Sequence, residues 1–355
     1  MVLDRIAARR IALVKPSALG DIVHSLPVLT ALRARFPAAH ITWVVNAAYE
    51  SLLAGHPDLS DTLAFDRGGF NRGARKAVAT AVSFAAELRR RQFDLVIDMQ
   101  GLLRSGLIAW LSGAPTRVGF RSAREGSRYA YTHKIGTPTL GAAHAVDRMW
   151  AVAEAFGVGH LPKTSRVPLQ PVEVEAARAE LAALPKPWVA VAVGAKWVTK
   201  RWPTEHFAEL LNRAQSHFGG TCVFIGAADD TALSQQVVAN LRGPALDLTG
   251  KTSLSRLAAV LSLADVTVGN DTGPLHLAAA LGRPCVAPYT CTRVARHGPY
   301  AQAANCVETT VACAGSYLKK CGNMICMPDL TADRLWPKLA EAVDAWQRTH
   351  HSRSA

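Results

Sequence analysis

The chain has 355 residues, of which 49% are hydrophobic and 19% charged; these proportions exclude an intrinsically disordered protein and match a globular one of about two domains. Its net charge of +13 is uneven: residues 1–165 carry 21 Lys and Arg against 12 Asp and Glu, and residues 166–355 carry 19 against 15. The first half, at +9, is therefore expected to meet an anionic partner such as nucleic acid, a membrane surface or a phosphorylated glycolipid.

The N-terminal residues and the hydrophobic stretches give no sign of secretion or of a membrane span. Met1–Arg10 is polar, and the apolar run Ile11–Val14 is too short for the hydrophobic part of a signal peptide. No 18 consecutive residues are apolar, as a membrane-spanning helix would require. We therefore predict a cytoplasmic protein without a transmembrane segment.

Seven cysteines, an odd number, favour the reducing cytoplasm over a disulfide framework. Four of them lie close together in the sequence, at Cys306, Cys313, Cys321 and Cys326. The intervening stretches of six, seven and four residues lack the two-residue separation found in most zinc sites. Free or buried thiols are favoured over a structural metal, and both interpretations stay open.

Apolar runs of strand length alternate with helix-length segments in the first half of the chain. Strands are predicted at Ile11–Val14, Ile41–Val45 and Asp94–Asp98, and helices from Asp21 to about Arg35, over Ala77–Arg91 and over Leu102–Leu111. The last of these, which is apolar apart from Arg104, is typical of a buried or interfacial helix. Apolar strands separated by helices predict parallel βαβ units.

Leu161–Pro171 contains three prolines and predicts a linker, after which the same alternation begins again. Strands are predicted at Trp188–Val193, Thr221–Ile225, Val266–Val268 and, as the last one, Cys285–Pro288. Helices are predicted at Thr204–His217, Ser253–Ser262, Gly273–Leu281 and Ala332–Gln347. The sequence thus predicts two doubly wound α/β domains, at 1–165 and 166–355, with the terminal helix 332–347 a candidate to pack back on the first. Such domains bind ligands at the carboxyl ends of their strands.

The turn Asn270–His276 follows a β-rich run and leads into a predicted helix. Pro274 suits an early helical position, where its missing N–H costs nothing, and Asp271 or Thr272 can serve as the N-cap. Free N–H groups from Gly273 onward would bind phosphate, helped by the helix dipole. A plain capped helix accounts for the same residues equally well.

Two other turns of the second half carry charged groups. Lys196, Lys200 and Arg201 lie within six residues of one another and would neutralise a pyrophosphate leaving group in the absence of a metal. A solvated basic loop is the simpler interpretation.

Asp230 follows the strand at 221–225 and would accept hydrogen bonds from ribose hydroxyls, although N-capping explains it as well.

In the first half, Asp21 is placed in the first turn of a helix, whose positive end keeps the carboxylate ionised, as a general base must be. N-capping is again the alternative.

Asp98–Ser105 is another polar turn between a strand and a helix, and it is followed by several arginines, whose guanidinium groups suit carboxylates and phosphates. These arginines are Arg117, Arg121, Arg124 and Arg128.

Together, four of these segments resemble the lipopolysaccharide heptosyltransferases of glycosyltransferase family 9, in the same order and with similar spacing. The matching segments are Val14–Asp21, Asp98–Ser105, Lys200–Pro203 and Asp271–His276. The resemblance runs from about residue 11 to 340. It implies a GT-B fold, two Rossmann-like domains facing a central cleft, with an inverting reaction and no catalytic metal or cofactor.

The resemblance also implies roles for individual residues. Asp21 corresponds to the family's proposed general base, and Lys200 to the lysine that neutralises the donor phosphates. The expected contacts with an ADP-heptose donor, held by the C-terminal domain, are Lys196, Lys200, Asp230, Asp271, Thr272, Gly273 and His276. The expected contacts with the acceptor, held by the N-terminal domain, are Ser17, Gln100, Arg104, Arg121 and Arg124.

The implied acceptor is the anionic Kdo–lipid A inner core of lipopolysaccharide, which would place the enzyme peripherally at the inner face of the cytoplasmic membrane. The loop 194–199 and the cysteine-bearing segment 306–326 are closer to the type II form than to the type I form. The choice between first and second heptose transfer stays open, as does another sugar or acceptor within the family.

Two readings outside the family remain. A nucleotide-sugar epimerase shares the GT-B architecture, but its additional carboxylates near the donor sugar are not evident. A nucleic-acid-binding protein would need a basic stripe with interleaved aromatic residues, which the sequence lacks.

Overall fold

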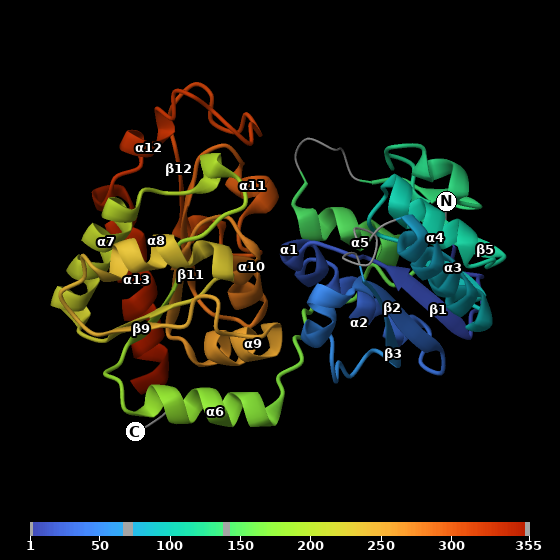
Figure 1. The fold of residues 1–355 in the computed structure, drawn as a ribbon, viewed down its shortest axis with the longest axis horizontal. Coiled ribbons are helices and arrows are strands. Elements are labelled where there is room, and N and C mark those ends of the chain that lie inside the picture. The colour runs from blue at the N-terminus through green and yellow to red at the C-terminus, as the bar shows by residue number, and fades with distance from the viewer. Residues whose placement is uncertain (1–2, 67–73, 138–142, 352–355) are drawn as a thin grey trace. The chain divides into compact units, whose positions relative to one another are not determined.

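The computed structural model describes residues 3–66, 74–137 and 143–351 (Figure 1). The chain forms two compact units, Met1–Pro168 and Leu169–Ala355. The division falls three residues after the expected one because Arg166 belongs to the first unit. Its Nη1 donates to Asp58 Oδ1 at 3.0 Å, and its carbonyl accepts a 2.9 Å hydrogen bond from His56 Nε2.

The first unit is built on a six-stranded parallel sheet with the order β3-β2-β1-β4-β5-β6. Its strands are β1 (Arg10–Val14), β2 (His40–Asn46), β3 (Asp61–Phe65), β4 (Leu95–Asp98), β5 (Thr116–Phe120) and β6 (His133–Ile135). Its helices are α1 (Leu19–Val23), α2 (Leu26–Arg35), α3 (Ala74–Arg90), α4 (Leu103–Leu111) and α5 (Ala145–Ala155), with short 3-10 turns η1 (Ala47–Leu52) and η3 (Ser127–Ala130).

The central strands of this sheet are almost entirely apolar because both of their faces are buried. Val14 of β1 pairs with Val44 of β2 on one side and with Asp98 of β4 on the other. Ile108 and Ala109 of α4 pack into the same core. Strands β2 and β3 are added on one side of β1, and β5 and β6 are added on the opposite side of β4. The strand order therefore reverses between β1 and β4. This reversal is the switch point at which such sheets bind ligands.

The second unit repeats this plan, with a parallel sheet of order β12-β11-β10-β7-β8-β9. Its strands are β7 (Trp188–Ala192), β8 (Thr221–Phe224), β9 (Ala245–Asp247), β10 (Val266–Gly269), β11 (Cys285–Tyr289) and β12 (Cys306–Glu308). Its helices are α6 (Pro171–Ala182), α7 (Thr204–Phe218), α8 (Thr231–Val238), α9 (Leu254–Leu263), α10 (Gly273–Ala280), α11 (Val294–His297), α12 (Cys326–Asp329) and α13 (Ala332–His351), with 3-10 turns η4 (Val198–Lys200), η5 (Ala228–Asp230) and η6 (Ala303–Asn305). The switch point here lies between β7 and β10.

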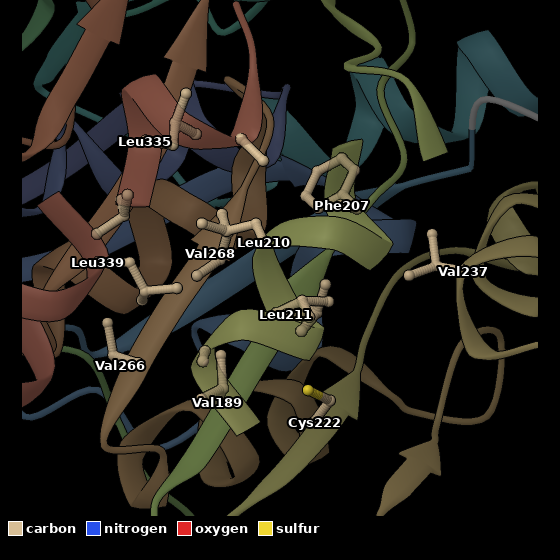
Figure 2. Close-up of a cluster of buried hydrophobic side chains, with 14 of the residues drawn as sticks. Val189, Phe207, Leu210, Leu211, Cys222, Val237, Val266, Val268, Leu335 and Leu339 are labelled. Atoms are coloured by element: carbon tan, nitrogen blue, oxygen red, sulfur yellow. The ribbon is translucent and has the colours of Figure 1, made fainter. Parts of the chain in front are cut away.

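Helix α13 belongs to the core of the second unit. Its residues Leu335 and Leu339 pack with Phe207 and Leu211 of α7 over the strands of the sheet, as Figure 2 shows. The apolar face of this helix is buried within its own unit.

The predicted strands and helices are present, and the differences are one divided helix and several elements that the sequence did not reveal. The segment after Asp21 is two helices, because Pro27 lies in the first turn of α2, and Asp21 is the third residue of α1. Cys285–Tyr289 is followed by one more strand. The unpredicted strands are β3, β5, β6, β9 and β12, and the unpredicted α-helices are α5, α6, α8, α11 and α12. Three of these, β6, β9 and β12, are three-residue strands at sheet edges, too short to show a periodic pattern.

Across the described ranges, no helix combines the length and the hydrophobicity that crossing a bilayer would demand.

Candidate functional site

In the second unit, polar turns follow the two strands that form the switch point. Residues 194–201 follow β7 and residues 270–272 follow β10, so both lie at the carboxyl edge of the sheet. Asn270, which is fully buried, joins the two turns. Its Nδ2 donates to Val193 O at 2.7 Å, and its Oδ1 accepts from the Trp202 backbone N–H at 3.1 Å. Both ends of the amide are used, which fixes one turn against the other.

Asp271 is the centre of a buried polar cluster. Its Oδ2 accepts from Lys200 Nζ at 2.5 Å and from Thr292 Oγ1 at 2.7 Å, and its Oδ1 lies 3.2 Å from His276 Nε2. Burial opposes ionisation of the carboxyl group, but the His276 hydrogen bond and the Lys200 charge outweigh it and hold the pKa of Asp271 below its usual range. The cluster therefore contains a permanent carboxylate shared among three donors.

Helix α10 begins directly after this carboxylate. Thr272 occupies the N-cap position, but its hydroxyl donates to Asn270 O at 3.2 Å, and among the described residues no side chain caps the helix. Thr272, one of the two expected residues, is therefore the N-cap, although its side chain makes no capping hydrogen bond. Since the first N–H groups of a helix have no partner within it, those of Gly273 and Leu275 stay available to an anion.

The lysine loop is anchored from several sides. Lys200 Nζ lies 4.8 Å from the centroid of the Trp197 ring, and Arg201 Nε donates to Ala195 O at 2.7 Å. Thr199 Oγ1 donates to Leu318 O at 2.6 Å. Lys196 is exposed in the same loop, so of the three cations expected to act together only Lys200 reaches Asp271. The loop ends at Pro203, the N-cap of α7.

Asp230 lies at the carboxyl edge of the same sheet, beyond β8. Its Oδ2 accepts from the Ala227 N–H at 3.1 Å. A Cβ atom added at Gly194 would come within 2.0 Å of the Asp230 Cγ, so the carboxylate fills the space that glycine leaves open at the end of β7. Lys200, Asp230, Asp271, Thr272, Gly273 and His276 are thus all placed along one edge of one sheet.

His297, in α11, provides a test of the electrostatics of this region. Burial lowers the pKa of His297 from 6.5 to about 4, with Asp271 acting in the opposite direction. Between pH 6.5 and 4 the unfolded chain binds a proton at this histidine and the native state does not. The contribution of His297 to the free energy of unfolding is therefore complete above pH 6.5 and is lost as the pH falls toward 4. It amounts to about 3 kcal/mol.

We expect His297→Phe, a neutral ring that can keep the edge contact with Tyr317, to reduce the fall in Tm between pH 6.5 and 4.5. Differential scanning calorimetry across this range measures the effect. His160→Gln, at an exposed histidine, is the control and should keep the wild-type slope. Equal slopes for the wild type and His297→Phe would contradict the assignment.

In the first unit, the turn after β1 carries Asp21. The carboxylate is half exposed, its Oδ2 accepts the Ala18 N–H at 3.2 Å, and its Oδ1 lies 3.9 Å from Lys15 Nζ. Lys15 is buried and also donates to Met99 O at 3.2 Å. The exposed half of the Asp21 side chain is accessible to a substrate hydroxyl. Ser17 is partly exposed in the same turn.

The turn after β4 is organised by the buried Asp98. Its Oδ1 accepts the N–H groups of Gln100 at 2.8 Å and Gly101 at 3.0 Å, and its Oδ2 accepts from Tyr131 at 2.6 Å. Burial raises the pKa of Asp98 although these hydrogen bonds oppose the rise. Gly101 has φ of +68°, which permits the sharp turn, and the Gln100 Oε1 is buried without a hydrogen-bond partner among the described residues.

The arginines predicted for the acceptor are exposed beside this turn. Arg104 lies in α4, and Arg121 and Arg124 follow β5. The Arg124 N–H donates to Gly101 O at 2.9 Å, which ties the two segments together. Gln100, Arg104, Arg121 and Arg124 thus occupy neighbouring turns at the carboxyl edge of the first sheet.

Several residues that position the two sites were absent from the predicted set: Lys15, Asp98, Tyr131, Asn270 and Thr292. Thr292 follows β11, the neighbour of β10, so the rule that ligands bind at the carboxyl ends of strands points to it. Tyr131 was not detectable, because its contact with Asp98 joins segments 33 residues apart.

All seven cysteines are free thiols. Cys313 and Cys321 are exposed, whereas Cys306 lies in β12 and is partly buried. Within the part of the chain that the structure describes, no three His, Cys, Asp or Glu side chains are arranged to hold a metal ion.

With this geometry established, comparison with known proteins identifies the family. The model of glycosyltransferase family 9 (heptosyltransferase) matches residues 81–324. Lipopolysaccharide heptosyltransferase 1 of Pseudomonas aeruginosa is 28% identical over 327 residues, which cover 88% of this chain and 87% of the relative.

Among solved structures, a family 9 glycosyltransferase from Veillonella parvula superposes with a TM-score of 0.82 at 24% identity, covering 94% of this chain and 97% of the other. The ADP-heptose lipopolysaccharide heptosyltransferase II of Escherichia coli has a TM-score of 0.76 at 22% identity, covering 95% and 99%. These likenesses confirm the predicted α/β GT-B fold.

The family match spans more than half of the chain and includes Asp98–Ser105, Lys200 and Asp271–His276, three of the four segments on which the resemblance was based. The chain therefore belongs to glycosyltransferase family 9, the heptosyltransferases, and is a glycosyltransferase.

Proposed function

We propose that the protein transfers heptose from ADP-L-glycero-D-manno-heptose to the Kdo–lipid A inner core of lipopolysaccharide, with inversion at the anomeric carbon. The observation that carries the proposal is the Lys200–Asp271 pair beside the uncapped start of α10, at the switch point of the second sheet. Names of the similar proteins, which include lipopolysaccharide and ADP-heptose, support both substrates.

In this proposal the second unit binds the donor. The N–H groups at the start of α10 and the Lys200 ammonium stabilise the diphosphate, on which negative charge increases as ADP leaves. Asp230, at the end of β8, accepts hydrogen bonds from the ribose, and His276 and Asp271 contact the sugar side of the diphosphate. Lys196, exposed in the same loop, adds a further cation for the donor.

The first unit binds the acceptor. Asp21 takes the proton from the acceptor hydroxyl while its oxygen forms a bond to the anomeric carbon, and the bond from that carbon to the β-phosphate oxygen breaks. Attack opposite the leaving group inverts the configuration. Ser17, Gln100 and the exposed arginines Arg104, Arg121 and Arg124 bind the acceptor, since guanidinium groups pair with its carboxylates and phosphates. This places the enzyme at the inner face of the cytoplasmic membrane, where it meets a lipid-anchored substrate.

ADP-heptose should raise the Tm by several degrees at concentrations well above its Kd, because a ligand that binds only the native state stabilises it. UDP- and GDP-sugars at the same concentration should have little effect. Thermal-shift measurements with the three nucleotide-sugar classes test the donor, and stabilisation by UDP-sugars alone would contradict it.

Mass spectrometry of reactions with Kdo-lipid A and with its heptosylated form tests the acceptor and separates first from second heptose transfer. Addition of one heptose to either glycolipid supports the proposal. Release of free sugar or of an epimerised nucleotide sugar, with both glycolipids unchanged, would contradict it.

A further inference from the structure

Helix α4 exposes a row of large apolar side chains that the fold of the first unit does not use. Leu103, Leu107 and Trp110, here called the α4 stripe, are 59%, 49% and 57% exposed. They occupy positions i, i+4 and i+7, so they share one face of the helix. The opposite face, with Ile108 and Ala109, packs into the core. When both faces of a surface helix are apolar, the outer face is expected to be buried against a second apolar partner.

The surroundings of the stripe are basic and aromatic. Residues 99–134 contain six Lys and Arg and one acidic residue, Glu125. η3 packs against α4, and a Cβ at Gly106 of α4 would come within 2.7 Å of the Ser127 Cβ, so the two elements are in close contact. Tyr129 of η3 is 74% exposed, and Arg128 Nη2 donates to its hydroxyl at 2.9 Å.

We propose that the α4 stripe inserts into the interfacial layer of a membrane containing anionic lipids, while the exposed Arg128 of the adjacent η3 binds the lipid headgroups. Leucine and tryptophan bury their apolar surface at this depth, tryptophan and tyrosine are favoured at membrane–water interfaces, and cations are attracted to the anionic surface. The biological setting rests on the proposed function, in which the acceptor is a membrane glycolipid, and the stripe is the surface by which the enzyme reaches it.

The size of the stripe favours a lipid surface over a second copy of the chain. From Leu103 to Trp110 the helix rises about 10 Å. A stable protein interface buries roughly 800 Å² on each partner, much more than three side chains on one helix provide. The excess of positive charge around the stripe also opposes self-association and complements an anionic surface.

The test is sedimentation of the full chain with vesicles of neutral lipid, and of neutral lipid mixed with anionic lipid, without donor or acceptor. Leu107→Gln/Trp110→Gln should lower partitioning into the anionic vesicles by about tenfold or more, since two apolar side chains no longer leave water. Leu169→Gln/Val172→Gln changes two exposed apolar residues of the second unit, 38% and 76% exposed, and should bind as the wild type does. Glutamine is a good helix former, so helix α4 should remain intact, as circular dichroism can verify.

Several outcomes would overturn the inference: wild-type protein that ignores anionic vesicles at low salt, equal loss in both double variants, or a wild-type dimer that the Leu107→Gln/Trp110→Gln variant dissociates. In a transfer assay, this variant should lose activity on acceptor in vesicles and retain it on a delipidated acceptor. Vesicle binding without any transfer would overturn the proposed function and leave the docking surface intact.

Discussion

Asp21→Asn is expected to lower kcat for heptose transfer by about 10²–10⁴-fold and to leave ADP-heptose affinity unchanged. The amide has the shape of the carboxylate but cannot take the proton of the acceptor hydroxyl. Asparagine Oδ1 can still accept the Ala18 N–H, which Asp21 Oδ2 accepts at 3.2 Å, so the start of α1 should be preserved. Asp21→Ala loses this hydrogen bond as well and is expected to cost about 0.5–1.5 kcal/mol of stability, the net contribution of one hydrogen bond.

Three measurements distinguish a base from a structural residue. Titration calorimetry gives the donor Kd, steady-state kinetics separates kcat from KM, and the Tm reports the loss of the hydrogen bond. If Asp21→Asn matched the wild type in kcat, or lost donor affinity in proportion to activity, Asp21 would not be the base.

Lys200→Met should both destabilise the protein and weaken donor binding. Lys200 and Asp271 are 17% and 5% exposed, so removing the ammonium leaves a buried carboxylate without its main counter-charge. Breaking such a pair from one side costs about 3–5 kcal/mol. Loss of a charged contact to the diphosphate adds a further roughly 10- to 100-fold loss in ADP-heptose affinity.

The double variant Lys200→Met/Asp271→Asn separates the two effects. Removing both charges should recover much of the lost stability, because no unpaired carboxylate remains in the interior. Donor affinity should stay low, because the ammonium is still missing. Recovery of donor affinity in the double variant, measured by titration calorimetry, would show that Lys200 acts only by neutralising Asp271.

The sequence was sufficient to predict the repeated α/β plan, because buried parallel strands such as Ile11–Val14 are apolar throughout and stand out from the helices around them. Short edge strands such as Cys306–Glu308 were missed, since three residues carry no periodicity. The apolar face of α13 indicates burial from the sequence but does not identify what buries it, which in the structure includes α7 and the second sheet.

For the sites, the strand-to-helix turns singled out Asp21, Lys200 and Asp271 as candidates, and the resemblance to the family supplied their expected roles. The hydrogen bonds that connect the site residues could not be predicted from local sequence pattern. The pairing of Asp271 with Thr292 and the amide bridge of Asn270 depend on which strands are neighbours, and that is a property of the folded sheet.

The three-residue strands β6, β9 and β12 have a consequence for behaviour at high concentration. Each is an edge strand of its sheet. An edge strand of three residues leaves very few unpaired N–H and C=O groups with which another chain could pair. Lengthening one of these strands by design would create a template for intermolecular β-pairing. Keeping these strands short therefore limits edge-to-edge aggregation where many copies of the folded chain meet.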